Sequence, residues 1–136
     1  ILERVVEKPR RERQKRLVKF GLDAPDVADA VKTYRKTILD MEAALAEHAW
    51  VVGDEFSLAD VSLAPYFQTL AQFGWTALYD QDCPRVTDWY ARCSERPSYQ
   101  EGVAVDFPAE LVARLQGEGA AVWHKIEQHF GEHPAA

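Results

Sequence analysis

The chain has 136 residues, of which 47% are hydrophobic, and a formal net charge of −6. These values fit one globular domain and exclude a chain that its composition keeps disordered. The acidic balance argues against nucleic acid or an anionic membrane as a partner, and no apolar run approaches the roughly 20 residues of a membrane-spanning helix. Two cysteines are too few for a disulfide framework, so we expect a cytoplasmic protein.

The charge is unevenly distributed along the chain. Residues 1–20 contain eight basic and three acidic residues, a surplus of +5, which leaves −11 on residues 21–136. The basic residues alternate with Glu7 and Glu12, and no aromatic residue that could stack on a base precedes Phe20. A solvated helix surface is one interpretation of this basic run, and attraction of an anionic ligand is another. We expect no nucleic-acid partner.

Helices are predicted from the start of the chain. Residues 1–7 are typical of the end of a helix, and residues 10–20 predict a short one before Gly21. A long helix is predicted for residues 25–49, with Pro25 and Asp26 suited to its first turn. Its apolar residues recur at spacings of three and four along one stripe, namely Val27, Val31, Tyr34, Ile38, Met41 and Leu45.

The sharpest local signal is a helix start at residues 56–61. Ser57 is suited to the N-cap position, and Asp60, three residues later, can accept a hydrogen bond from the backbone N–H of Ser57. Phe56 and Val61 would then meet as a hydrophobic staple. The geometry of such a capping box satisfies both polar side chains, so Ser57 and Asp60 are interpreted as structural.

The helix predicted for residues 58–73 is apolar over most of its circumference, which indicates a place in the middle of a helix bundle. A helix from Pro84 to the residue before Pro97 follows, with Val86, Trp89, Tyr90 and Cys93 on its inward face, and then a short helix or turn over residues 98–105. Two further helical segments are expected on either side of Gly117 and Gly119, followed by a frayed end at residues 131–136. The sequence therefore predicts one all-α domain, a bundle of about six helices over residues 1–136.

Two motifs resemble the C-terminal helical domain of cytosolic glutathione transferases, and the likeness follows the helix order along the chain. They are Trp50-x-x-Gly53-Asp54-x-Phe56-Ser57-Leu58-Ala59-Asp60-Val61, followed by Pro65, and Trp89-x-x-Arg92-x-x-x-Arg96-Pro97. The resemblance implies an N-terminal thioredoxin-like domain, missing from this chain, that binds the co-substrate glutathione and supplies the Tyr, Ser or Cys that activates its thiol. We therefore expect no catalytic residue in this chain, and inactivity of the chain alone.

The same resemblance implies a substrate pocket on this domain. The cleft side of the helix over residues 58–73 would present Tyr66, Thr69 and Phe73, with Ser62 deeper, and Trp123 would cover the pocket. These residues would receive a small hydrophobic electrophile in a full-length protein that is a homodimer. The alternative is that the same side chains only pack the bundle.

Other reactive side chains have simpler interpretations. Cys83 precedes Pro84 at a helix start, where a thiolate would be favoured, whereas Cys93 lies on an apolar face. His129 and His133 have a metal-ligand spacing but no fixed third ligand, so no metal site is expected. A second function also stays open, because domains of this kind serve as protein-interaction modules without catalysis.

Overall fold

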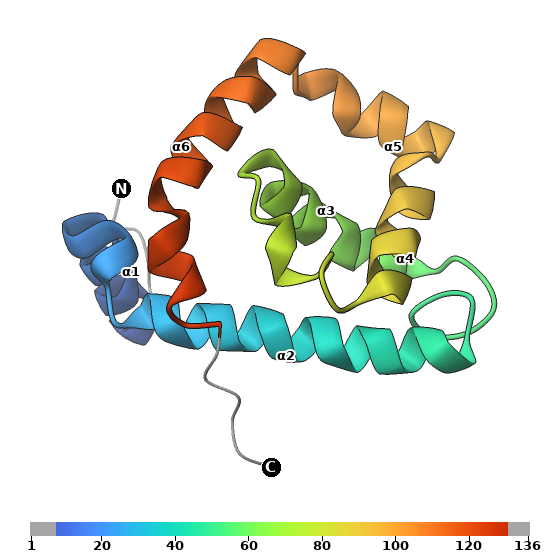
Figure 1. The fold of residues 1–136 in the computed structure, drawn as a ribbon, viewed down its shortest axis with the longest axis horizontal. Coiled ribbons are helices and arrows are strands. Elements are labelled where there is room, and N and C mark those ends of the chain that lie inside the picture. The colour runs from blue at the N-terminus through green and yellow to red at the C-terminus, as the bar shows by residue number, and fades with distance from the viewer. Residues whose placement is uncertain (1–7, 131–136) are drawn as a thin grey trace. The chain divides into compact units, whose positions relative to one another are not determined.

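The structure is a computed structural model that describes residues 8–130. Its described part contains α-helices, short 3-10 turns and one isolated β-bridge between Trp50 and Gly53, and no strand (Figure 1). The all-α prediction is therefore confirmed, whereas the expectations for residues 1–7 and 131–136 lie outside the described residues. The helices are α1 (Lys8–Phe20), α2 (Asp26–Glu47), α3 (Leu58–Gln72), α4 (Pro84–Ser94), α5 (Pro97–Gly102) and α6 (Ala109–Glu127).

The chain divides into two compact units, residues 1–34 with 124–136 and residues 35–123. In the first unit, Ala24, Val27, Val31 and Ile126 are buried. Two ion pairs add to this unit: Arg16 binds Asp26 through two hydrogen bonds of 2.7 and 2.6 Å, and Lys125 binds Asp23 at 2.6 Å. The first unit therefore combines a small apolar core with polar contacts.

The second unit has the larger core, which is centred on the indole of Trp89. Phe67 packs edge-on against Trp89 with ring centroids 5.0 Å apart, and against Tyr79 at 5.2 Å. The remaining buried apolar residues of this core come from α2, α3, α4 and the turn before α4; they are Ile38, Met41, Leu45, Ala64, Leu70, Leu78, Cys83, Val86 and Cys93. The spacing of these residues confirms the inward faces predicted for α2 and α4.

The sequence predicted that α3 lies in the middle of the bundle, and this prediction is wrong for one side of the helix. Phe67 and Leu70 are buried, but Leu58 is 82% exposed, Val61 51% and Tyr66 56%. Figure 1 shows α4 and α6 beside α3. Apolar composition alone could not show that this helix is covered on only part of its circumference.

The two helical segments expected around Gly117 and Gly119 form one helix, α6. A Cβ atom on Gly119 would lie 1.9 Å from the carbonyl oxygen of Phe73, whereas one on Gly117 would meet nothing within 4 Å. Gly119 therefore permits close packing of α6 on the end of α3, and does not interrupt the helix.

A side chain of α2, Glu42, caps the N-terminus of α4. Glu42 accepts hydrogen bonds from the backbone N–H of Arg85 at 3.3 Å and of Val86 at 2.9 Å. A carboxylate at this position satisfies donors that a helix start leaves without intrahelical partners. Nearby, the buried Arg35 of α2 pairs with Asp82 and donates to the carbonyl of Leu78.

Candidate functional site

The N-terminus of α3 contains the predicted capping box. The Ser57 hydroxyl accepts a hydrogen bond from the N–H of Ala59 at 3.3 Å, and the Asp60 carboxylate accepts one from the N–H of Ser57 at 2.9 Å. The reciprocal bond from the N–H of Asp60 to Ser57 completes the box. This geometry supports the interpretation of Ser57 and Asp60 as structural residues.

Asp60 has two further partners that sequence spacing did not reveal. Its Oδ1 accepts hydrogen bonds from the indole Nε1 of Trp89 at 2.8 Å and from the N–H of Val51 at 3.2 Å. Burial by itself would raise the pKa of the Asp60 carboxyl, but the hydrogen bonds from Trp89, Ser57 and Val51 outweigh burial and lower it. Asp60 is therefore an ionised carboxylate with fixed structural partners and has no exposed surface.

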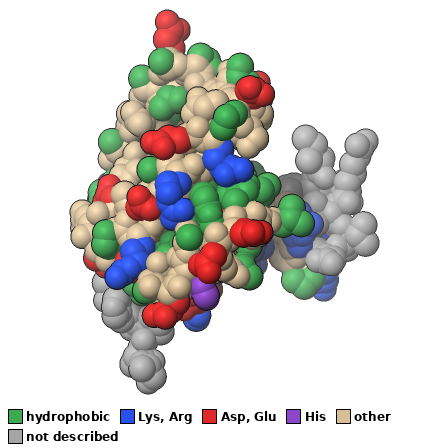
Figure 2. All heavy atoms as spheres, turned by 90° about the vertical axis from the view of Figure 1, so that its right-hand side faces the viewer, with side chains coloured by type: hydrophobic (Ala, Val, Ile, Leu, Met, Phe, Trp, Pro, Cys, Tyr) green, Lys and Arg blue, Asp and Glu red, His purple; other side chains and the backbone are tan. Residues whose placement is uncertain are grey.

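The two arginines of the second sequence motif, Arg92 and Arg96, contact aromatic residues that precede α3. The guanidinium of Arg92 lies 4.4 Å from the ring centre of Trp50, and that of Arg96 lies 3.8 Å from the ring centre of Phe56. Arg92 also donates to the carbonyl of Ala49 at 2.8 Å. Figure 2 shows one face of the molecule, on which Lys and Arg side chains lie beside hydrophobic side chains. These arginines hold the loop before α3 against α4.

The outer stripe of α3 is the exposed face formed by Leu58, Val61, Ser62, Pro65, Tyr66 and Thr69, which recur at spacings of three and four. It brings together two of the predicted site residues, Tyr66 and Thr69. Ser62, which was expected deeper, is exposed as well, because it lies on the same face of the helix. The hydroxyls of Ser62 and Thr69 donate to backbone carbonyls one turn earlier, at 2.7 and 3.0 Å. The stripe thus presents mainly apolar surface.

Phe73 and Trp123 lie where α3 ends against α6. The Phe73 ring stacks on Trp75 with centroids 5.1 Å apart, and Trp75 donates from Nε1 to the carbonyl of Gly119 at 3.0 Å. Trp123 is half-buried one turn after Gly119. Phe73 therefore has packing partners within this chain, and the pocket roles of Phe73 and Trp123 stay predictions.

A shallow groove of about 330 Å³ lies elsewhere, between the end of α2 and α4. The cationic side chains on its rim have partners: Arg85 pairs with Glu42 at 3.0 Å, and Arg92 with Asp88 at 2.8 Å. The groove contains none of the predicted substrate-binding residues. Its lining residues are Leu45, His48, Ala49, Pro84, Arg85, Asp88 and Arg92.

Comparison with known proteins identifies the family. The profile described as "Glutathione S-transferase, C-terminal domain" matches residues 9–97, which is more than half of the chain. The chain belongs to this family. The match includes the capping box of α3 and all of α4, and it ends at Pro97, before α6.

Curated relatives support the assignment to the glutathione S-transferase family. Glutathione S-transferase GstB of Escherichia coli strain K12 is 33% identical over 67 residues, which cover 48% of this chain and 30% of GstB. Glutathione S-transferase hmp2 of Hypomyces subiculosus is 29% identical over 87 residues, 62% of this chain and 41% of hmp2. The matches thus span less than half of each relative. No solved structure gave a significant match.

Within this glutathione S-transferase domain, the two cysteines are buried and free of disulfides. Cys83 has no exposed surface, and burial raises the pKa of its thiol, so the expectation that a thiolate is favoured at Cys83 is wrong. Burial also raises the pKa of Cys93 to about 12. Residues 8–130 contain no group of three or more His, Cys, Asp or Glu that could hold a metal ion. No helix within residues 8–130 combines the length and the apolar character that a bilayer span requires.

Proposed function

We propose that this domain shapes the hydrophobic co-substrate pocket of a glutathione S-transferase-type enzyme. In this proposal, a separate thioredoxin-like domain binds glutathione and activates its thiol, and the outer stripe of α3 forms one wall for a small hydrophobic electrophile. The glutathione thiolate then attacks the electrophile. No side chain of this chain takes part in the chemical step, so the chain alone is inactive.

The exposed apolar surface of the outer stripe is the observation that carries the proposal. Leu58, Val61 and Tyr66 leave more than half of their surface accessible, on a helix whose opposite side is in the core. Small-molecule sites are lined mainly by apolar and aromatic groups with a few polar ones. Tyr66 supplies an aromatic side chain with a hydroxyl, and Thr69, one turn on, contributes a methyl group and a hydroxyl.

The test compares variants of the full-length enzyme with glutathione and 1-chloro-2,4-dinitrobenzene, a small aromatic electrophile. Loss of the Tyr66 ring in Tyr66→Ala should raise KM for the electrophile about tenfold and leave KM for glutathione unchanged. Val105→Ala is the matched control, because Val105 is 69% exposed but lies outside α3. Equal kinetic constants for Tyr66→Ala and Val105→Ala would contradict the proposal.

The cellular setting belongs to the same proposal. The family resemblance favours a homodimer for the full-length protein, and the two thiols, which form no disulfide, suit the reducing cytoplasm. Sedimentation of the full-length protein at micromolar concentration tests the dimer, and a monomer at that concentration would contradict it.

A non-catalytic interaction module is the second candidate function, and one observation favours it. Helix α1 carries many charges and has no buried residue. Retention of the full-length protein on immobilised glutathione, with release by free glutathione, separates the two functions. The enzyme requires retention, and the module does not.

A further inference from the structure

Helix α1 is a concentrated positive surface in an acidic chain. Among its 13 residues, seven are basic and Glu12 is the only acidic one, and none of the 13 is buried. The hydrophobic core therefore does not require these side chains. The basic residues are Lys8, Arg10, Arg11, Arg13, Lys15, Arg16 and Lys19.

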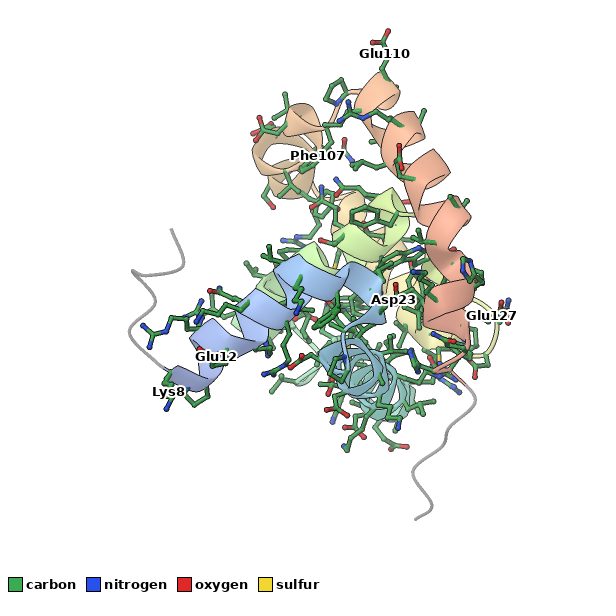
Figure 3. The ribbon with its side chains drawn as sticks, turned by 90° about the vertical axis from the view of Figure 1, so that its left-hand side faces the viewer. Lys8, Glu12, Asp23, Phe107, Glu110 and Glu127 are labelled. Carbon is green, nitrogen blue, oxygen red and sulfur yellow. The ribbon has the colours of Figure 1, made fainter. Side chains whose placement is uncertain are left out.

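Within the described residues, ion pairs join two of the seven cations to a carboxylate. Lys15 pairs with Glu12 at 3.0 Å, and Arg16 pairs with Asp26. No carboxylate of residues 8–130 forms an ion pair with Lys8, Arg10 or Arg13, whose side chains are exposed; Figure 3 labels Lys8 and Glu12 at the start of this helix. Like charges three and four residues apart destabilise a helix, so a bound anion would stabilise α1.

The distribution of the charges limits what kind of anion fits. At 100° per residue the basic side chains surround α1, whereas a helix that lies on a membrane needs one apolar face. Single-stranded nucleic acid needs stacking aromatics, and Phe20 at the end is the only aromatic residue of α1. These two features disfavour a lipid surface and a single strand.

The rest of the chain disfavours a long, rigid polyanion. Residues 35–123 contain six Lys and Arg against 14 Asp and Glu, a net charge of −8. Duplex DNA carries a dense line of phosphates, so the net charge of −6 on the whole chain opposes its binding. A short acidic peptide avoids that repulsion, and its flexible backbone can bring carboxylates to several sides of the helix.

We propose that α1 binds a short acidic peptide segment of a partner protein, whose carboxylates contact Lys8, Arg10 and Arg13. Arginine suits this contact because its planar guanidinium binds a carboxylate through two parallel hydrogen bonds. This inference does not depend on the proposed enzymatic function, because its residues are not among those assigned to the proposed pocket.

The experiment measures binding of a fluorescein-labelled poly-Glu peptide to the complete chain by fluorescence anisotropy. A poly-Gln peptide of equal length is the control ligand. We expect poly-Glu to bind at low salt, at least tenfold weaker binding at about 0.15 M salt, and no binding of poly-Gln. Absence of poly-Glu binding at low salt would overturn the proposal.

Charge-reversal variants locate the site. Arg13→Glu should weaken poly-Glu binding about tenfold, whereas Arg114→Glu, the same charge change on an exposed residue of α6, should weaken it less than twofold. Arg13→Gln should give an intermediate loss, and circular dichroism establishes that each variant is folded. Equal effects of Arg13→Glu and Arg114→Glu, or tighter binding of duplex DNA or anionic vesicles than of poly-Glu, would refute the assignment.

Discussion

The indole Nε1 of Trp89 donates a 2.8 Å hydrogen bond to Oδ1 of Asp60, although the two residues are 29 positions apart. The same carboxylate accepts the backbone N–H of Ser57 at the start of α3. Asp60 therefore joins the beginning of α3 to the centre of α4, and one side chain serves both helix capping and the attachment of two helices.

Replacement of Asp60 by alanine should remove the cap and leave the buried Trp89 donor without its acceptor. We expect Asp60→Ala to lower the free energy of unfolding by about 2–4 kcal/mol, against about 1 kcal/mol for Ser57→Ala. Urea denaturation followed by tryptophan fluorescence measures both values. Asp88→Ala is the control, because Asp88 pairs with Arg92 on the surface. An unchanged urea midpoint for Asp60→Ala would refute the role of this carboxylate.

Stability should depend on the ionisation of Asp60. Hydrogen bonds lower its pKa in the folded chain, so its stabilising effect is complete above the unfolded-state pKa of about 4 and is lost as the pH falls through the folded-state pKa. Ion pairs with Arg16 and Arg35 lower the pKa values of Asp26 and Asp82 in the same direction. The melting temperature should therefore fall between about pH 5 and pH 2.

The contribution of Asp60 to this acid sensitivity can be separated with two variants. Asp60→Asn cannot lose a charge at that position, so its melting temperature should fall less over the same pH range. Val105→Ala, which removes no carboxylate, should retain the full acid sensitivity of the unmodified chain. If the slopes of Asp60→Asn and the unmodified chain were equal, other carboxylates would account for the acid effect.

Replacement by alanine should have opposite effects on stability at Gly117 and Gly119 of α6. At Gly119 the added methyl group would overlap the backbone of Phe73, so α3 and α6 would have to separate, with a loss of about 2 kcal/mol or more. At Gly117 nothing lies within 4 Å, and alanine should stabilise the chain by about 0.5–1 kcal/mol. Thermal unfolding of the two variants measures the contrast. Stabilisation by Gly119→Ala would show that the two helices do not pack this closely.

Both cysteines should resist alkylation in the folded chain. Cys83 has no exposed surface and Cys93 is 2% exposed, and burial raises the pKa of both thiols. Iodoacetamide needs an accessible thiolate. Mass spectrometry should detect no rapid labelling in buffer and two labels in urea. Rapid labelling of Cys83 in buffer would contradict its burial.

The features that could be predicted from sequence are those set by neighbouring residues. The inward stripe of α2, the capping box of Ser57 and Asp60 and the inward face of α4 depend on spacings of three and four residues, which sequence displays directly. The family resemblance placed Tyr66 and Thr69 on a common side of α3, and both are exposed there. Whether that side binds an electrophile stays a prediction.

The remaining features depend on partners far along the chain. The bond from Trp89 to Asp60 and the close approach of Gly119 to Phe73 join residues 29 or more positions apart, so no local pattern indicates them. The apolar composition of α3 likewise predicted burial on all sides. Whether Leu58 and Val61 are buried depends on which other helices pack against them. The apolar character of the two residues does not determine that packing.

Glu42 makes part of the stability of α4 depend on the packing of α2 beside it. Because it supplies the acceptors for the first N–H groups of α4 from 43 and 44 residues away, α4 obtains this cap only after α2 has reached its place. A peptide of residues 80–96 therefore lacks a stabilising contact that α4 has in the whole chain, and should be mostly unfolded in water. Helix α4 thus acquires its stability by docking, and its formation reports the assembly of the second unit around it.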